Sequence, residues 1–227
     1  MRIEPFGVGS YVHVIKRGAR GLPITKQQSD KWRFLRLLYY MNDEFLDQNW
    51  DNYTKRKDLF KRLDSWPERK PIVSIIAFTL MPNHMHVALR ENREGGISKF
   101  MQRIGQAMTN YHNEKYKEHG SLFQGSYRSH TIADDRYMQY VAAYIAVKNV
   151  FELYPNGGLS GARENFENAW KWALQFPFSS LADYVHARNF PILDGDVLNE
   201  ILPPPQEFKI FAHDVIKSGK WLQEEFE

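Results

Sequence analysis

Cysteine is absent from the 227 residues of this chain. Without cysteine the chain has no disulfide framework and no thiolate metal site, so a metal ion would need histidine, carboxylate, amide or water ligands. Those ligands favour a hard divalent cation. Long apolar runs are also missing, since no stretch approaches the roughly 20 residues that cross a bilayer. The first residues, MRIEPFGVGSYVHV, lack the pattern of a signal peptide. We therefore expect a cytoplasmic protein with no membrane partner.

Charge of one sign is not in large excess either. The formal net charge of +3 at pH 7 is compatible with a nucleic-acid partner but equally with an enzyme that has none. Basic residues do gather between positions 55 and 70: Lys55, Arg56, Lys57, Lys61, Arg62, Arg69 and Lys70. Such a cluster is either a solvated surface or a set of phosphate contacts, and the sequence leaves both interpretations open.

Apolar and aromatic residues, in contrast, are plentiful enough for a folded core. They make up 43% and 15% of the chain, respectively. Because domains usually have about 100–200 residues, we expect one domain with additions. The turn-rich segment YPNGGLSGAREN follows Phe151 and suggests a boundary. We expect a main domain over residues 1–152 and a C-terminal extension over residues 153–227, made of a loop and then short helices.

Four strands are predicted in the main domain. Alternation of apolar and polar residues predicts strands over residues 11–16, 84–91 and 127–132. Over residues 71–81 apolar side chains fall on both faces, which predicts a central strand that is covered on both sides.

Three helices are predicted between and after these strands. Helical spacing of apolar residues predicts a first helix from Ser29, as its N-cap, to about residue 42, and a second from Ile97 that ends at Gly120. A third should cover residues 136–151, with Asp134 and Asp135 at its positive end. The order of strands and helices is that of a ferredoxin-like βαββαβ fold, an α+β class with helices packed on an antiparallel sheet.

The most distinctive local feature is a pair of histidines in the string LMPNHMHVALRE. Because side chains alternate along a strand, His84 and His86 should point to the same, solvent-facing side, while Met85, Val87 and Leu89 point into the core. Two neighbouring imidazoles can form half of a metal site. Two ordinary hydrogen-bonded histidines would show the same spacing, so the spacing alone does not decide.

The residues around this pair resemble a known family. LMPNHMHVALRE is similar to the HUH motif of the insertion-sequence-200-like tyrosine transposases, in particular the REP-associated tyrosine transposases. YVHVIKRGARGLPI resembles the first strand and turn of that family. GGISKFMQRIGQAMTNYHNEKYKEHGSLFQGSYRSHTI resembles its long helix, LFQG loop and next strand, and DDRYMQYVAAYIAVKNV resembles its nucleophile helix. The resemblance covers residues 8–150 in order and extends weakly to FPFSSLADYV.

This resemblance implies both a fold and an activity. It implies the HUH nuclease fold and a metal-dependent transposase that cleaves and rejoins single-stranded or hairpin DNA through a 5′-phosphotyrosine intermediate. It also implies that His84 and His86 bind a divalent cation, Mg²⁺ or Mn²⁺, which would neutralise charge on the phosphodiester. The implied partner is DNA, bound by a monomer or homodimer.

Three tyrosines of the third predicted helix compete for the role of nucleophile. Tyr137, Tyr140 and Tyr144 are spaced at i, i+3 and i+7 and should share one helical face, which is more often a packing pattern than a catalytic one. The similarity of AYIAVKNV to the nucleophile segment of the family, usually R-Y-I-H-L-N-P-V, implies Tyr144. A phenolate suits reversible strand transfer because it is also a good leaving group.

One turn after Tyr144 the chain departs from the family pattern. The family has Asn or Gln as a third metal ligand where this chain has Lys148, and a protonated lysine has no lone pair to donate. Asn149 is adjacent but points about 100° away on an ideal helix, so it substitutes only if the helix is locally shifted. Three outcomes remain open: water completes the coordination, Lys148 contacts the phosphate, or the enzyme is impaired.

Contacts to DNA are less defined by the sequence. The candidates for phosphate contacts, each equally plausible as a plain surface charge, are Lys16, Arg17, Lys99, Arg103 and Arg128. Phe123 and Tyr127 either stack on unpaired bases or cap the sheet. His13 and His130 are expected to be structural.

Two other functions compete with the transposase interpretation. One is a domesticated, noncatalytic DNA-hairpin-binding module on the same fold, which Lys148 favours. The other is a metal-dependent hydrolase of small phosphoesters, which is disfavoured because no cluster of acidic ligands accompanies the histidines. A covalent protein–DNA adduct would distinguish the enzyme from the binding module.

Overall fold

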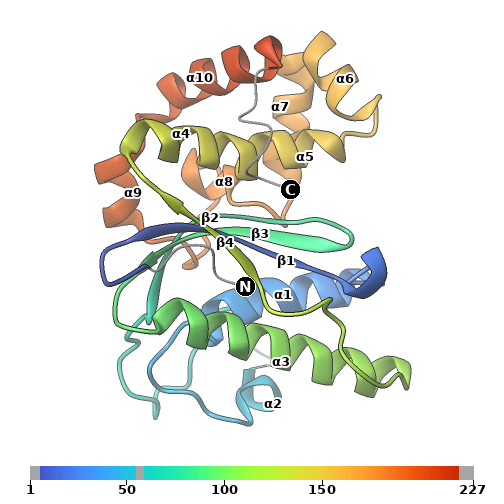
Figure 1. Ribbon diagram of the computed structural model, residues 1–227, viewed down its shortest axis with the longest axis vertical. Helices are drawn as coiled ribbons and strands as arrows, with labels where there is room; N and C mark the ends of the chain where they lie inside the picture. The colour runs from blue at the N-terminus through green and yellow to red at the C-terminus, as the bar shows by residue number, and fades with distance from the viewer. Residues whose placement is uncertain (1–5, 55–58, 220–227) are drawn as a thin grey trace.

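A computed structural model describes residues 6–54 and 59–219 of the chain. At its centre lies a four-stranded antiparallel sheet in the order β2-β3-β1-β4 (Figure 1). The strands are β1 (Tyr11–Arg17), β2 (Val73–Leu80), β3 (His84–Glu91) and β4 (Arg128–Ile132). This order and the intervening helices confirm the predicted α+β, ferredoxin-like class.

Two long helices, α1 (Gln28–Tyr40) and α3 (Gly96–Tyr116), cover one face of the sheet (Figure 1). The alternate positions that point to these helices, such as Val14 of β1 and Val87 of β3, are fully buried. A short helix, α2 (Trp50–Thr54), and the 3₁₀ turn η1 (Ala19–Gly21) lie in connecting segments. This side of the sheet is a conventional apolar core.

The opposite face is covered by a chain of three consecutive helical segments. They are α4 (Asp135–Ala143), the π-helical turn η2 (Tyr144–Lys148) and α5 (Asn149–Glu152). The helices of the C-terminal extension follow: α6 (Gly158–Glu164), α7 (Phe166–Gln175), α8 (Leu181–Tyr184), α9 (Gly195–Ile201) and α10 (Pro205–Ser218). Helices α6, α7 and α10 lie on the outer side of α4 and α5, whereas α8 and α9 lie nearer the sheet and α9 contacts β2 (Figure 1). One apolar cluster joins the extension to α4, η2 and α5, so these segments lie between the sheet and the extension (Figure 1).

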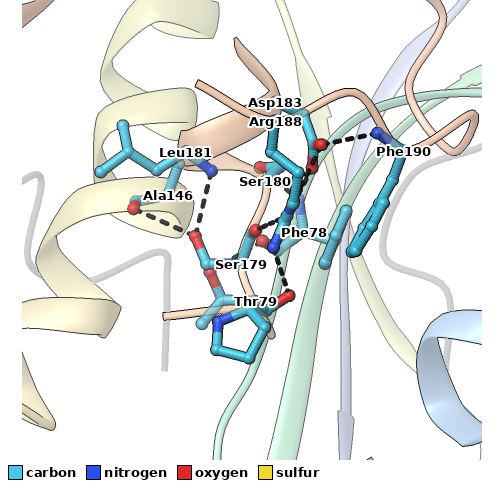
Figure 2. Close-up of polar contacts among 10 residues, drawn as sticks. Phe78, Thr79, Ala146, Ser179, Ser180, Leu181, Asp183, Arg188 and Phe190 are labelled. Carbon is cyan, nitrogen blue, oxygen red and sulfur yellow. Dashed lines mark hydrogen bonds and ion pairs between the residues drawn. The ribbon is translucent and has the colours of Figure 1, made fainter. Parts of the chain in front are cut away.

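Strand β2 was predicted to be central, but it lies at the edge of the sheet. Its free edge is covered by the extension: the N–H of Leu80 donates to the carbonyl of Phe178 at 2.9 Å, and the N–H of Ser180 donates to the carbonyl of Phe78 at 3.0 Å. The Ser180 hydroxyl also accepts from the N–H of Phe78 at 3.0 Å (Figure 2). Because this segment shields the edge from solvent, an edge strand carries the apolar pattern of a central one.

Two helix ends differ from the prediction. Helix α1 begins one residue before Ser29, with Gln27 as its N-cap, because the Asp30 carboxylate accepts the N–H groups of Lys26 and Gln27 at 2.8 and 2.9 Å. Helix α3 ends at Tyr116, before the predicted Gly120, and the next residue, Lys117, adopts a left-handed φ of 56°. The acidic start of the third predicted helix is confirmed, since the Asp134 carboxylate accepts the N–H of Tyr137 at 2.8 Å.

The π-helical turn η2 interrupts what the sequence predicts as one continuous α-helix. Here the N–H of Asn149 donates to the carbonyl of Tyr144, five residues back instead of four. The carbonyl of Ile145 accepts a hydrogen bond from the hydroxyl of Thr79 in β2. The carbonyl of Ala146 accepts one from the hydroxyl of Ser179 in the extension (Figure 2). The turn is therefore held by side chains from two segments distant in sequence.

Candidate functional site

His84 and His86 lie on the sheet face that η2 covers. Their ring centroids are 4.7 Å apart with the planes at 75°. The ring of Tyr144 meets His86 edge-on at 5.5 Å and His13 at 6.1 Å. The structure thus brings the two predicted ligands and the predicted nucleophile together. The expectation of a solvent-facing pair is wrong for His86, which is only 2% exposed because η2 lies over it.

Hydrogen bonds engage the Nδ1 atom of each of these two imidazoles. Nδ1 of His84 lies 2.7 Å from Oδ1 of Asn83, whose amide nitrogen donates to the carbonyl of Gly21 at 3.2 Å. An amide oxygen only accepts, so His84 carries its proton on Nδ1. Nδ1 of His86 lies 2.9 Å from Nε2 of His13. His84 therefore offers the lone pair of its Nε2 atom. His86 can likewise offer the lone pair of its own Nε2 atom.

Burial keeps both imidazoles neutral. It lowers the pKa of His84 to about 4, with further lowering by the charges of Arg17 and Lys148. Burial also lowers the pKa of His86 well below its usual value, and the neighbouring His13 and His84 add to this effect. Two neutral imidazoles with engaged Nδ1 atoms are suitable donors for a divalent cation. Among the described residues, no group of three or more His, Cys, Asp or Glu side chains could hold a metal, so a third protein ligand would be of another type.

Lys148 and Asn149 are the two candidates at that third position. The Lys148 ammonium lies 4.7 Å from the ring centroid of Tyr144 and 2.5 Å from Oε1 of Glu152. Asn149 is 2% exposed, and its side-chain nitrogen has no hydrogen-bond partner among the described residues. Because its N–H bonds to the carbonyl of Tyr144, Asn149 takes the place one turn after Tyr144 that the residue at i+4 has in an α-helix. The local shift that Asn149 needs is present.

Tyr137 and Tyr140 of α4 have other neighbours than Tyr144, which begins η2. Tyr140 packs against Phe211 of α10, with ring centroids 5.0 Å apart, whereas Tyr144 contacts His86. Tyr137 is partly buried beside the apolar cluster that α4 shares with the extension. Helix α4 also contacts α10, so tyrosines one helical turn apart reach different elements.

Two of the five candidate phosphate contacts lie on the histidine side of the sheet. Arg17 pairs in register with His84, and Arg128 pairs with Ile15. Both arginines are exposed and line a cavity of about 180 Å³ together with residues 124–127. The structure therefore places a positively charged hollow beside the histidine pair.

The remaining three cations lie toward α3 on the other side. Lys16 is 8% exposed, and its ammonium donates to the carbonyl of Gly125 at 3.0 Å. Arg103 donates to the carbonyls of Met41 and Asp43 at 3.1 and 2.5 Å. Lys99 is an exposed residue of α3. The structure does not bring these three together with the histidines.

The two candidate base-stacking aromatics contribute to packing. Phe123 is 4% exposed, and the Lys16 ammonium lies 4.7 Å from the centroid of the Phe123 ring. The Tyr127 hydroxyl lies 3.0 Å from Oγ of Ser98, and its ring packs against the apolar core. These contacts favour the capping interpretation over base stacking.

The basic cluster of residues 55–70 is only partly described, since Lys55, Arg56 and Lys57 lie outside the described residues. Arg62 forms an ion pair with the buried carboxylate of Asp43. The guanidinium of Arg69 lies 4.5 Å from the ring centroid of Tyr39. The described part of the cluster thus includes arginines with contacts inside the protein.

Part of the chain is similar to a known protein family. Residues 53–148 match the family model described as "Transposase IS200 like". A solved structure entitled "Structure of the REP associates tyrosine transposase bound to a REP hairpin" aligns with 87% of this chain and 92% of its own, at 15% identity and a TM-score of 0.49. A comparison with proteins of curated function finds no match. Within the described residues, no helix is long and apolar enough to span a membrane.

Proposed function

We propose that this chain cleaves and rejoins single-stranded or hairpin DNA with Tyr144 as the nucleophile, which the match of residues 53–148 to the IS200-like transposase family model supports. The observation that carries this proposal is the edge-on contact between the rings of Tyr144 and His86. Tyr144 lies in the helical turn η2 and His86 lies on strand β3, and folding brings the two residues into contact. A phenol beside a pair of neutral imidazoles is the arrangement that metal-assisted phosphoryl transfer to tyrosine requires.

The reaction is a transesterification. The phenolic oxygen of Tyr144 forms a bond to phosphorus while the bond from phosphorus to the 3′-oxygen breaks. The phenolic proton is lost, and the departing 3′-oxygen takes up a proton, which leaves a 5′-phosphotyrosine and a free 3′-hydroxyl. One phosphoester replaces another, so the reverse attack by a 3′-hydroxyl rejoins strands without another energy source.

His84 and His86 would hold a divalent cation, Mg²⁺ or Mn²⁺, through their Nε2 atoms. When bound, such an ion supplies positive charge to the non-bridging oxygens of the phosphate. We propose Asn149 as the third protein ligand, which its one-turn relation to Tyr144 and its unpartnered buried amide support. A half-turn of the amide presents its oxygen instead of its nitrogen.

Lys148 would then contact the phosphate instead of the metal. Its ammonium lies beside the ring of Tyr144, and its charge acts on both His84 and His86. Arg17 and Arg128 would bind neighbouring phosphates along the strand, as their shared cavity suggests. These three cations give the histidine side of the sheet its proposed affinity for DNA.

A second candidate function is a noncatalytic module that binds DNA hairpins. The Lys148 ammonium near the histidines favours it, because a positive charge there opposes cation binding. The metal-dependent hydrolase of small phosphoesters receives no comparable support, because no acidic ligand cluster is found among the described residues.

The experiment incubates the protein with end-labelled hairpin DNAs that carry single-stranded flanks, in Mg²⁺ or Mn²⁺, and detects adducts on denaturing gels. The wild type should form an adduct, and Tyr144→Phe should form none while it still binds the DNA. Tyr140→Phe is the matched control, because it removes the same atom from a tyrosine that packs against Phe211 instead of His86 and should keep the adduct. An adduct in Tyr144→Phe would refute the assignment of the nucleophile. DNA binding by the wild type without any adduct would support the binding module.

A further inference from the structure

His13 lies beside the proposed metal site without belonging to it. It is fully buried on β1, and its Nε2 atom is 2.9 Å from Nδ1 of His86. The two rings are nearly parallel, at 20°. The sequence suggests only a structural histidine at this position. The contact shows that His13 touches one of the two proposed ligands directly.

This hydrogen bond has one proton and two possible directions. If His86 donates from Nδ1, its Nε2 carries the lone pair that a cation needs, and His13 must hold its own proton on Nδ1. If His13 donates from Nε2 instead, neutral His86 holds its proton on Nε2 and cannot coordinate through that atom. The position of one proton therefore decides whether His86 is a ligand.

The partner of His84 does not have this freedom. Oδ1 of Asn83 can only accept, and the amide nitrogen of Asn83 donates to the carbonyl of Gly21, so this contact selects the Nδ1–H form of His84. The imidazole of His13 can accept or donate in its contact with His86.

We infer that His13 is a positioning residue that accepts the Nδ1 proton of His86 and keeps Nε2 of His86 available for a cation. This inference rests on the proposed function, since it gives His86 the role of a metal ligand. Partners of this kind orient ligating histidines in metalloproteins generally, and their loss typically lowers metal affinity about 10–100-fold.

The first test reads the tautomer of His86 directly. Nitrogen-15 NMR of the histidine rings in the full-length, metal-free protein should show His86 protonated on Nδ1 in the wild type. In His13→Leu, which removes the acceptor, this preference should be lost. A wild-type His86 that carries its proton on Nε2 would overturn the inference, whatever the metal affinity.

The second test measures Mn²⁺ binding by electron paramagnetic resonance titration. His13→Leu should bind Mn²⁺ about 10–100-fold more weakly than the wild type. His13→Gln, whose amide oxygen can still accept from His86, should stay within a few-fold of the wild type. His130→Leu is the matched control, because His130 pairs with His13 in the register of β1 and β4 but belongs to the neighbouring strand. It should leave the affinity unchanged.

Thermal unfolding of each variant checks that it is folded. If His13→Leu does not fold, the tautomer of His86 in the wild type and the Mn²⁺ affinity of His13→Gln still test the inference. Mn²⁺ binding by folded His13→Leu that equals the wild type would overturn the inference. A wild type that binds no Mn²⁺ but shows the Nδ1–H form of His86 would refute the metal proposal and leave the role of His13 in the tautomer intact.

Discussion

The two faces of the sheet are built from different kinds of residue. On the side of α1 and α3, the strand residues of the core are apolar, Phe78 and Met85 among them, and so is the rest of the core. On the side of η2, the same strands present His13, His84, His86 and Thr79, which are buried or half-buried. Burying a polar group costs free energy unless it is hydrogen-bonded. The comparison suggests that the first face stabilises the fold and allows the second to hold less favourable groups.

Polar contacts also serve different purposes on the two sides. On the first, Asp30 joins α1 to α3 by accepting hydrogen bonds from Lys115 at 2.6 Å and from the hydroxyl of Tyr116 at 2.7 Å. On the second, Thr79 and Ser179 hold a turn whose geometry departs from the α-helix. Substitutions on the first side should therefore change stability, and those on the second should change chemistry.

The largest expected effect is on the second face, at the histidine pair. His84→Ala or His86→Ala should abolish metal-dependent cleavage of hairpin DNA, because each removes an imidazole ligand, while DNA affinity stays largely intact because phosphate contacts dominate it. Cleavage assays and filter binding, run in parallel, measure the two properties. Undiminished cleavage by either variant would show that the proposed reaction does not depend on a metal held by these histidines.

A smaller effect is expected at the third position of the proposed site. Asn149→Ala should weaken Mn²⁺ binding about tenfold, the low end for a metal-site partner, as measured by calorimetry. Lys148→Met, which keeps the length of the side chain, should not weaken Mn²⁺ binding but should reduce the rate of adduct formation. The reverse pattern would mean that the π-helical turn does not bring Asn149 into the role of a ligand.

On the first face we expect a change in stability alone. Burial by itself would raise the pKa of Asp30, but hydrogen bonds from Lys115, from Tyr116 and from the two backbone N–H groups just before α1 outweigh it and lower the pKa from 3.8 to about 2. Asp30→Asn should therefore lower the free energy of unfolding by about 2 kcal/mol at neutral pH. Adduct formation by the folded variant should match the wild type.

The sign of the pH dependence follows from the lowered pKa. The contribution of the Asp30 carboxylate is complete above pH 3.8 and is lost as the pH falls toward about 2. The stability difference between wild type and Asp30→Asn, from urea unfolding, should therefore shrink over that range. A difference independent of pH would assign the effect to packing instead of to ionisation.

At the π-helical turn the expected loss of stability is smaller. Thr79→Val replaces the hydroxyl by a methyl group of similar size and leaves the carbonyl of Ile145 without this donor, which should cost about 1 kcal/mol. Thr79→Ser keeps the hydroxyl and serves as the control. If the turn positions Tyr144, Thr79→Val should also slow adduct formation with little change in DNA affinity. Equal adduct rates in all three proteins would make the hydroxyl purely structural.

The smallest expected effect concerns DNA affinity. Arg17→Gln should reduce the slope of log affinity against log salt by roughly one unit, because one phosphate contact is lost. Lys99→Gln changes the charge equally but lies on α3, on the other side of the sheet, and should leave the slope unchanged. Equal slopes for the two variants would mean that the exposed arginines of the histidine side are not preferred contacts.

Much of the fold is predictable from local patterns. Three strands follow from period-two alternation, β2 from its continuous apolar run, and the acidic start of α4 from capping, all of which involve residues close in sequence. The edge position of β2 does not, because its apolar pattern reflects shielding by Phe178 and Ser180, about a hundred residues later. The contact of Tyr140 with Phe211 likewise depends on the position of α10, which no local pattern reveals.

The sequence by itself determined that His84 and His86 share one face of a strand, since side-chain direction in a strand depends only on the alternation of neighbours. Only the tertiary structure decided what surrounds them. His13 meets His86 across 73 positions of sequence through the pairing of β1 and β3. The shift that gives Asn149 its place after Tyr144 depends on hydroxyls from Thr79 and Ser179. Hydrogen bonds between distant segments exist only once the chain has folded, and for that physical reason local sequence patterns do not contain them.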